Sequence, residues 1–354
     1  MRRTVIDTLP TTIRGPRSPK GNRASTFDHT CCHRACYGAL SAPSSAASAT
    51  AQTCQGRAAT IVGTGPAIQG TSGDDVIVTG TSQRTYAVAG NDLVCVSPSA
   101  VLVVAGDGDD VVDASQAGLT TSVTYLGAGL DRYLGGPGQS FVYADGTDDT
   151  VTDAWRAYLT VTAPVTGAPG TYTGGGLAVW SADQDVEIDL DTNMVTVGGV
   201  HAVNLSGIVH AGVVAPRAVL RGNAEDNYLW GAGCDVLFVG KGGNDTLRGA
   251  SYSEDSPYAQ IKSECVGMKA TMRQGSGDDN VQGWQGRNRL VGNAGNDELQ
   301  GRARSDVLLG GSGREDLRGG EESDVLRGGG GRDTADGQSG RDRCDAERER
   351  RCER

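Results

Sequence analysis

The chain has 354 residues, of which 54 are Gly, and a formal net charge of −11. Apolar residues make up 37% of it and aromatic residues 5%, less than a conventional globular core of this length contains. The acidic balance excludes a typical nucleic-acid-binding protein, and no apolar run is long enough for a transmembrane helix. Gly without a three-residue period excludes collagen, which leaves a low-complexity chain or a repeat fold with Gly at its turns.

Residues 1–49 are basic at first and then rich in small side chains. Ala47-Ser48-Ala49 has the form of a signal-peptide cleavage site, but the apolar segment that should precede such a site is missing. We interpret residues 1–49 as a degenerate signal or targeting segment, disordered or removed, with Thr50 as the mature start. The alternative is that the signal-like pattern is accidental.

Six cysteines lie beyond this segment. An even number of cysteines in a secreted chain indicates disulfides, although spacing alone does not fix their connectivity. We predict pairing in order along the chain: Cys54–Cys95, Cys234–Cys265 and Cys344–Cys352.

Two stretches lack the Gly-Asp pattern found elsewhere. Residues 153–219 are rich in Val, Thr and Ala, and Val186–Gly199 alternates apolar and polar residues as half-buried strands with a turn do. This stretch predicts either a solenoid that continues without ions or a small β-insert. Residues 250–273 predict an insertion loop at the surface, tied down by the disulfide between Cys234 and Cys265.

Eight nonapeptides follow one another without a gap over residues 274–345. Position 1 is Gly in seven of the eight, position 4 is Gly in six, and position 8 is apolar in all eight. Gly permits tight turns, and positions 7–9 form a short strand whose middle side chain points inward. Because one inward side chain per nine residues cannot bury itself, we expect the repeats to stack, two per coil, as an all-β parallel solenoid with a thin core.

Position 6 of each nonapeptide is a carboxylic acid or an amide. Coils of 18 residues place these side chains in two rows, one on each edge: Asp279, Asp297, Glu315 and Asp333, and Asn288, Asp306, Asp324 and Asp342. Carboxylates stacked at the strand spacing of about 4.7–4.9 Å repel one another unless a cation lies between them. Ca²⁺ accepts many oxygen ligands in flexible geometry, so it fits carboxylates and turn carbonyls better than Mg²⁺ does.

The pattern G-G-x-G-x-D-x-U-x, fullest in Gly310–Gly313 and Gly328–Asp333, resembles the RTX or hemolysin-type calcium-binding repeat of bacterial secreted proteins. The resemblance implies a right-handed parallel β-roll in which Ca²⁺ ions lie between successive turns, held by the position-6 side chains and backbone carbonyls. Two edges would hold at most six ions in residues 274–345. Asn288 lacks a charge and Glu315 is longer than Asp, and both depart from the pattern.

The resemblance extends upstream over residues 50–152 and 220–249, where Gly-Asp motifs recur. Ser140 replaces Asp in one turn, which we expect to lack a metal. Asp235 and Asp245 are ten residues apart, which indicates an insertion in one coil. The predicted metal ligands are Asp75, Asp92, Asp110, Asp131, Asp149, Asp235, Asp245, Asp279, Asn288, Asp297, Asp306, Glu315, Asp324, Asp333 and Asp342.

The charged residues Ala346–Arg354 follow the last repeat. Because the end of a solenoid needs a polar cap, we expect a short capping helix held by Cys344 and Cys352. The alternative is a C-terminal secretion signal of the kind that some RTX relatives use.

No H-E-x-x-H, G-x-S-x-G or Walker motif occurs in the sequence. We therefore expect a non-enzymatic, extracellular calcium-binding protein, secreted or at the cell surface, that folds on binding Ca²⁺. One alternative is an adhesion or matrix module that binds an extracellular protein or carbohydrate, for which an exposed aromatic row would be the sign. The other is the repeat part of a toxin or hydrolase without its effector domain.

Overall fold

The computed structural model describes residues 52–119, 121–145, 147–161, 165, 167–249, 265 and 268–353. The chain divides into two compact units, Met1–Ala49 and Thr50–Arg354. The predicted targeting segment, residues 1–49, lies outside the described residues. Every regular element within the described ranges is a β-strand, and these ranges contain no helix that could cross a membrane.

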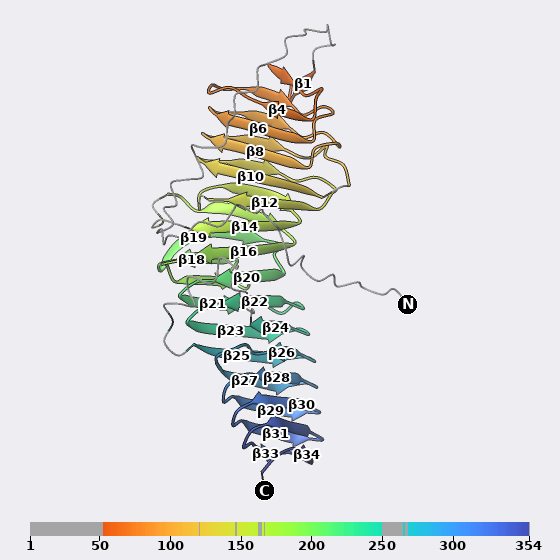
Figure 1. Cartoon of the computed structure of the whole chain (residues 1–354), viewed down its shortest axis with the longest axis vertical. Helices are drawn as coiled ribbons and strands as arrows, with labels where there is room; N and C mark the ends of the chain where they lie inside the picture. Colours follow the sequence, from red (N-terminus) through yellow and green to blue (C-terminus); the bar gives the residue numbers. More distant parts are fainter. Residues whose placement is uncertain are drawn as a thin grey trace, which may run out of the picture. The chain divides into compact units, whose positions relative to one another are not determined.

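The second unit is a parallel β-solenoid whose coils contribute alternately to two sheets (Figure 1). The first sheet has 15 strands. In order they are β4 (Ala67–Gln69), β6 (Arg84–Ala89), β8 (Leu102–Asp107), β10 (Ser122–Ala128), β12 (Ser140–Ala144), β14 (Arg156–Val161), β16 (Gly176–Ser181), β20 (His210–Val214), β22 (Tyr228–Ala232), β24 (Thr246–Gly249), β26 (Asn280–Gln282), β28 (Glu298–Arg302), β30 (Asp316–Glu321), β32 (Thr334–Ser339) and β34 (Arg348–Arg350).

The second sheet faces the first across the core. Its strands, in order of pairing, are β3 (Ile61–Val62), β5 (Val76–Val78), β7 (Leu93–Cys95), β9 (Val111–Asp113), β11 (Arg132–Leu134), β13 (Thr150–Ala154), β15 (Gly170–Gly174), β19 (Val200–Ser206), β18 (Met194–Val197), β17 (Val186–Asp189), β21 (Arg217–Arg221), β23 (Asp235–Gly242), β25 (Lys269–Ser276), β27 (Arg287–Ala294), β29 (Val307–Gly313), β31 (Val325–Gly331) and β33 (Arg343–Asp345). A short antiparallel pair, β1 (Thr53–Cys54) and β2 (Arg57–Ala58), precedes both sheets.

The 18-residue coil is present in the register of the strands. Leu290 pairs with Leu308 and Leu308 with Leu326 in the second sheet, while Leu299 pairs with Leu317 in the first. The position-8 side chains from Val281 to Ala335 are buried, so each sheet contributes one column to a thin core. This confirms the predicted all-β parallel solenoid.

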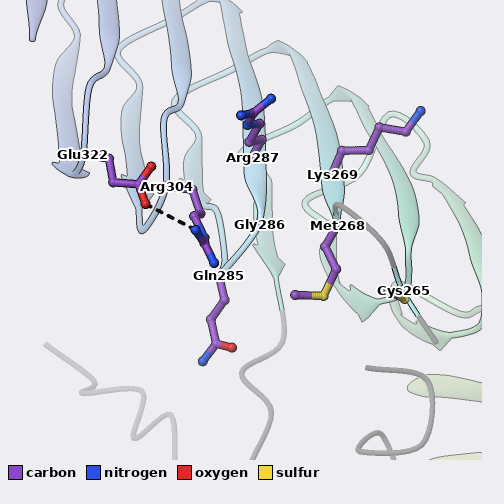
Figure 2. A pocket seen from close by; sticks show the side chains of 8 residues that line it. All are labelled: Cys265, Met268, Lys269, Gln285, Gly286, Arg287, Arg304 and Glu322. Atoms are coloured by element: carbon purple, nitrogen blue, oxygen red, sulfur yellow. Dashed lines mark hydrogen bonds and ion pairs between the residues drawn. The ribbon is translucent and has the colours of Figure 1, made fainter. Parts of the chain in front are cut away.

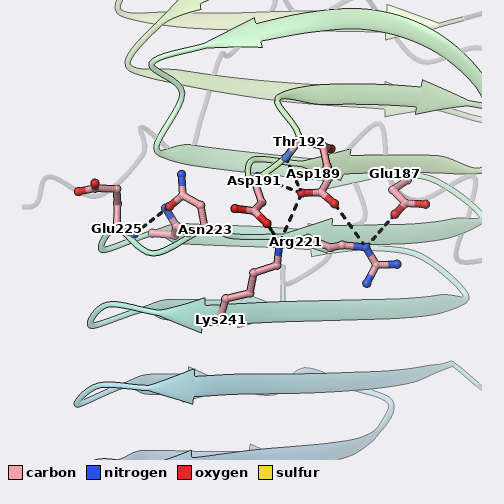
Figure 3. Close-up of polar contacts among 9 residues, drawn as sticks. Glu187, Asp189, Asp191, Thr192, Arg221, Asn223, Glu225 and Lys241 are labelled. Carbon is pink, nitrogen blue, oxygen red and sulfur yellow. Dashed lines mark hydrogen bonds and ion pairs between the residues drawn. The ribbon is translucent and has the colours of Figure 1, made fainter.

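Residues 153–219 combine both of the arrangements that the sequence predicted for them. Strands β14, β16, β20 and β22 continue the first sheet in parallel, whereas β17 and β18 form an antiparallel hairpin within the second sheet. The hairpin turn is tied to the following coils, because Lys241 Nζ lies 2.9 Å from Asp191 Oδ2 and Arg221 Nε lies 2.8 Å from Glu187 Oε1 (Figure 3).

The three disulfides pair in the predicted order: Cys54–Cys95, Cys234–Cys265 and Cys344–Cys352. Of the predicted insertion loop, residues 250–264, 266 and 267 lie outside the described residues. Its last residues were assigned wrongly, since β25 already begins at Lys269.

The predicted capping helix at the C-terminus is wrong. Residues Arg348–Arg350 instead form β34, which pairs in parallel with β32. An isolated helix as short as this segment is marginal in water, whereas the open edge of β32 offers unpaired main-chain groups, so strand addition prevails.

Candidate metal centre

The turns before the strands carry three rows of polar side chains. We call Asp75, Asp92, Asp110, Asp131 and Asp149 row N, Asp245, Asp279, Asp297, Glu315 and Asp333 row A, and Asn288, Asp306, Asp324 and Asp342 row B. Rows N and B lie where strands of the second sheet begin, and row A lies where strands of the first sheet begin. All of these side chains are buried, with exposed fractions of 5% or less.

One oxygen of most of these carboxylates links two successive coils. The main-chain N–H of Asp306 donates to Asp324 Oδ1 at 2.8 Å, and that of Asp324 donates to Asp342 Oδ1 at 2.9 Å. Row N repeats the arrangement, with four N–H to Oδ1 distances of 2.7–3.0 Å. Rows N and B are therefore continuous ladders, whereas row A is interrupted at Glu315, whose two carboxylate oxygens accept no hydrogen bond from the turn of Asp297.

The second carboxylate oxygen has no hydrogen-bond partner in most of these residues. An unpaired buried polar atom is costly, and a buried charge costs more, unless a counter-charge compensates it. Asp75, at the start of row N, differs, since its Oδ2 accepts hydrogen bonds from Thr71 N and Oγ1. The unpartnered atoms are Oδ2 of Asp92, Asp110, Asp131, Asp245, Asp279, Asp297, Asp306, Asp324, Asp333 and Asp342, and both Oε atoms of Glu315.

Burial raises the pKa of these acids. It raises the pKa of Asp306 to about 8, and that of Asp110 and Asp279 to about 7, with neighbouring carboxylates adding to the effect. Desolvation and like charge both disfavour the ionised form, and a bound cation would reverse both effects.

The position-1 glycines show which oxygens converge. A Cβ built on Gly301 would lie 2.5 Å from Asp306 Oδ2 and 2.5 Å from the main-chain oxygen of Gly319. A carboxylate oxygen and a carbonyl oxygen from the next coil meet in the same way beside Gly292, Gly319 and Gly337, and this is the oxygen-only donor set that Ca²⁺ prefers. Within the described ranges no three His, Cys, Asp or Glu side chains form a metal-binding cluster, so a cation here would depend on main-chain oxygens as well.

Asp235 does not belong to any row, which corrects the prediction. Its side chain is 47% exposed and lies 3.0 Å from Lys269 Nζ. In the nonapeptide frame that starts at Gly222, Asp235 falls at position 5, where side chains face solvent, and Asn227 takes position 6.

Asn227 is a further member of this series that was not predicted, although its nonapeptide GNAEDNYLW fits the repeat. The main-chain N–H of Asn227 donates to Asp245 Oδ1 at 2.9 Å, so this amide precedes row A. On the other edge, Val236 and Ala270 pair in register ahead of Asn288. Row B therefore has no carboxylate before Asp306.

A pocket of about 590 Å³ opens beside Cys265 and Met268 (Figure 2). Among its described lining residues the one acid, Glu322, pairs with Arg304 at 3.4 Å, and Cys265 is bonded to Cys234. The described lining offers no paired nucleophile and base and no residue of the three rows. It consists of Cys265, Met268, Lys269, Gln285, Gly286, Arg287, Arg304 and Glu322.

Comparison with known families gives a match over part of the second unit. The RTX calcium-binding nonapeptide repeat occurs in four copies, at residues 219–247, 275–299 and 309–344. These ranges contain row A and most of row B, but not row N. No curated protein matches the chain. The stacked nonapeptides, their buried acids and this match together identify the C-terminal coils as RTX calcium-binding repeats on a parallel β-solenoid.

Proposed function

We propose that this protein is an extracellular, non-enzymatic calcium-binding β-roll whose acidic coils fold when Ca²⁺ binds. The observation that carries the proposal is the series of buried, unpartnered carboxylate oxygens, repeated coil after coil along rows A, B and N. Without a cation, these coils should be unstable at neutral pH, because desolvation and mutual repulsion of the ionised carboxylates both oppose folding.

Each part of the turn has a separate task in this function. The Oδ1 atom of a row residue orients its carboxylate by accepting the N–H of the preceding turn, as Asp342 does for Asp324. The Oδ2 atom and a carbonyl oxygen remain as ligands. Bound Ca²⁺ supplies positive charge between the coils, so its binding free energy becomes folding free energy.

The disulfides and the acidic composition are consistent with an oxidising, calcium-rich location for this function. Three disulfides are typical of extracellular chains, and an acidic chain that stays unfolded at low calcium is suited to export before it folds.

The proposal is tested by calcium titration calorimetry together with far-ultraviolet circular dichroism, in Ca²⁺ and then in chelator. We expect several ions per chain and a loss of β signal in chelator. Asp306→Asn should weaken binding, whereas Asp235→Asn, which changes an exposed carboxylate outside the rows, should not. Identical β content in both conditions, or equal effects of the two variants, would contradict the proposal.

A carbohydrate-binding or adhesive role has one supporting observation, an aromatic row on the outer face of the first sheet. Tyr125, Tyr143 and Tyr158 stack with ring centroids 4.7 and 4.8 Å apart, and Trp155 beside Phe141 is 43% exposed. Retention of the protein on polysaccharide columns tests this second candidate. Retention that Trp155→Ala abolishes would favour it, and no retention on any column would count against it.

A further inference from the structure

The last coil of the solenoid is shorter than the others. From Asp279 onwards, one coil separates successive ligands of rows A and B by 18 residues, as between Glu315 and Asp333. After Asp333 the repeat pattern would place the next ligand at Arg351, which cannot bind a cation. The strand register shows instead that the last coil is shortened, because Thr334 of β32 pairs with Arg348 of β34. The residue before β34, Glu347, therefore occupies the position that Asp333 occupies before β32, only 14 residues further on.

Glu347 also makes the contact with the preceding turn that most row residues make. The main-chain N–H of Asp333 donates to Glu347 Oε2 at 2.7 Å, as the N–H of Glu315 donates to Asp333 Oδ1 at 3.1 Å. Burial raises the pKa of Glu315 most, and the nearby carboxylates of Asp333 and Glu347 raise it further, as expected for three acids that share this end of the row.

The unpartnered carboxylate oxygens of Glu315 and Asp333 independently indicate a cation site at this end of row A. Glu315 and Asp333 are 2% and 1% exposed, and Glu315 Oε1 and Oε2 and Asp333 Oδ2 have no hydrogen-bond partner. No other buried residue of row A has both carboxylate oxygens unpartnered. Glu315 accepts no main-chain N–H of the kind that Asp accepts elsewhere in the row, so both of its carboxylate oxygens are left to bind a cation.

The short coil is held in place by contacts that need no ion. The disulfide Cys344–Cys352 closes it, Arg351 Nε lies 2.7 Å from Asp336 Oδ1, and Arg341 Nε lies 2.9 Å from Glu353 Oε1. Glu347 is therefore presented to the end of row A by a covalently closed segment.

We propose that Glu347 is the terminal ligand of row A, and that it forms with Asp333 and Glu315 a divalent-cation site that the nonapeptide pattern does not contain. The proposal rests on the calcium-binding function proposed above. The competing explanation is that Glu347 only caps the last N–H of the row. An amide would serve that purpose equally well, since its oxygen accepts the same hydrogen bond.

The experiment compares full-length protein with Glu347→Gln and, as the matched control, Glu349→Gln, an exposed residue of β34 on the same short coil. The probe is Ca²⁺ alone, measured by equilibrium dialysis and calorimetry, with circular dichroism at saturating calcium to verify that each variant folds. We expect Glu347→Gln to bind one ion fewer, or to bind one ion at least tenfold more weakly, while Glu349→Gln behaves as the wild type.

Wild-type stoichiometry and affinity in Glu347→Gln would overturn the proposal and leave Glu347 as a cap. Equal losses in both variants would also overturn it, because they would indicate a general effect of charge. If the unchanged chain bound no calcium, the proposed function itself would fail, an outcome that the wild-type titration alone identifies.

Discussion

Glycine serves two different purposes at positions 1 and 4 of the repeat. At position 1 it permits close approach: a side chain on Gly301 would collide with the carboxylate of Asp306. At position 4 the backbone is left-handed, with φ of 142° at Gly313. Arg304 and Glu322 occupy the same position with φ of 73° and 74°, so a side chain is accepted there at some cost in strain.

Alanine variants at position 1 and at position 3, which Gly330 occupies, should therefore differ in their effect on stability. Gly301→Ala should lower the free energy of unfolding by about 1–3 kcal/mol, because its Cβ would meet two oxygens at 2.5 Å. Gly330→Ala should change it by less than about 0.5 kcal/mol, since nothing lies within 4 Å of the added Cβ. Urea unfolding in excess calcium measures both, and similar losses for the two variants would show that the turn is not packed as described.

The buried acids also predict how stability depends on pH. Burial raises the pKa of Asp306 to about 8 and that of Asp110 to about 7, against about 3.9 for Asp in an unfolded chain. The folded, calcium-free protein therefore binds more protons than the unfolded chain between about pH 4 and pH 8. The stability that these protons give is complete below about pH 4 and is lost as the pH rises through 7 to 8.

Calcium should reverse this dependence, because it binds the deprotonated carboxylates. We expect the melting temperature in chelator to fall between pH 5 and pH 8, and the calcium-induced increase in melting temperature to grow over the same range. Melting curves at both pH values, with and without calcium, test this. A calcium-free protein that became more stable as the pH rose would contradict it.

At the scale of elements, the nine-residue period predicts strands, coils and core columns wherever coil length is constant. It fails where the length changes. Asp245 and Asp279 are consecutive in row A although 34 residues separate them, because the insertion lies between. Asp235 was predicted as a metal ligand because Gly and Asp are frequent around it, and the nonapeptide frame that starts at Gly222 was not applied there. The role of Glu347 could not be read from spacing, since only strand register shows that the last coil is shortened.

The C-terminal coil should act as a structural cap. Its strand β34 covers the edge of β32, and Glu347 satisfies the N–H of Asp333. We therefore expect a chain truncated after Asp345 to unfold at a lower temperature in calcium and to expose an edge that promotes association. Differential scanning calorimetry and light scattering measure these effects. Unchanged stability with a loss of export alone would favour a secretion signal instead.

At the scale of the whole molecule, the balance between apolar core and bound charge changes along the chain. The net charge of −11 opposes compaction throughout. In residues 153–219, 23 described apolar residues are buried and stabilise the fold against this repulsion. In residues 274–345 only eight are buried. The first stretch contains no row residue, and the second contains eight of the fourteen.

Calcium removal should therefore unfold the solenoid unevenly. The apolar surface buried by residues 153–219 stabilises that stretch without ions, while the C-terminal repeats bury too little to offset the entropy of ordering and the repulsion of their acids. Because stacked repeats contact only their neighbours, one part of a solenoid can open while another stays folded. In hydrogen exchange followed by mass spectrometry, we expect chelator to remove protection from β26 to β34 and to leave β14 to β21 protected. Loss of protection at one calcium concentration along the whole chain would show instead that the ions and the apolar core stabilise a single cooperative unit.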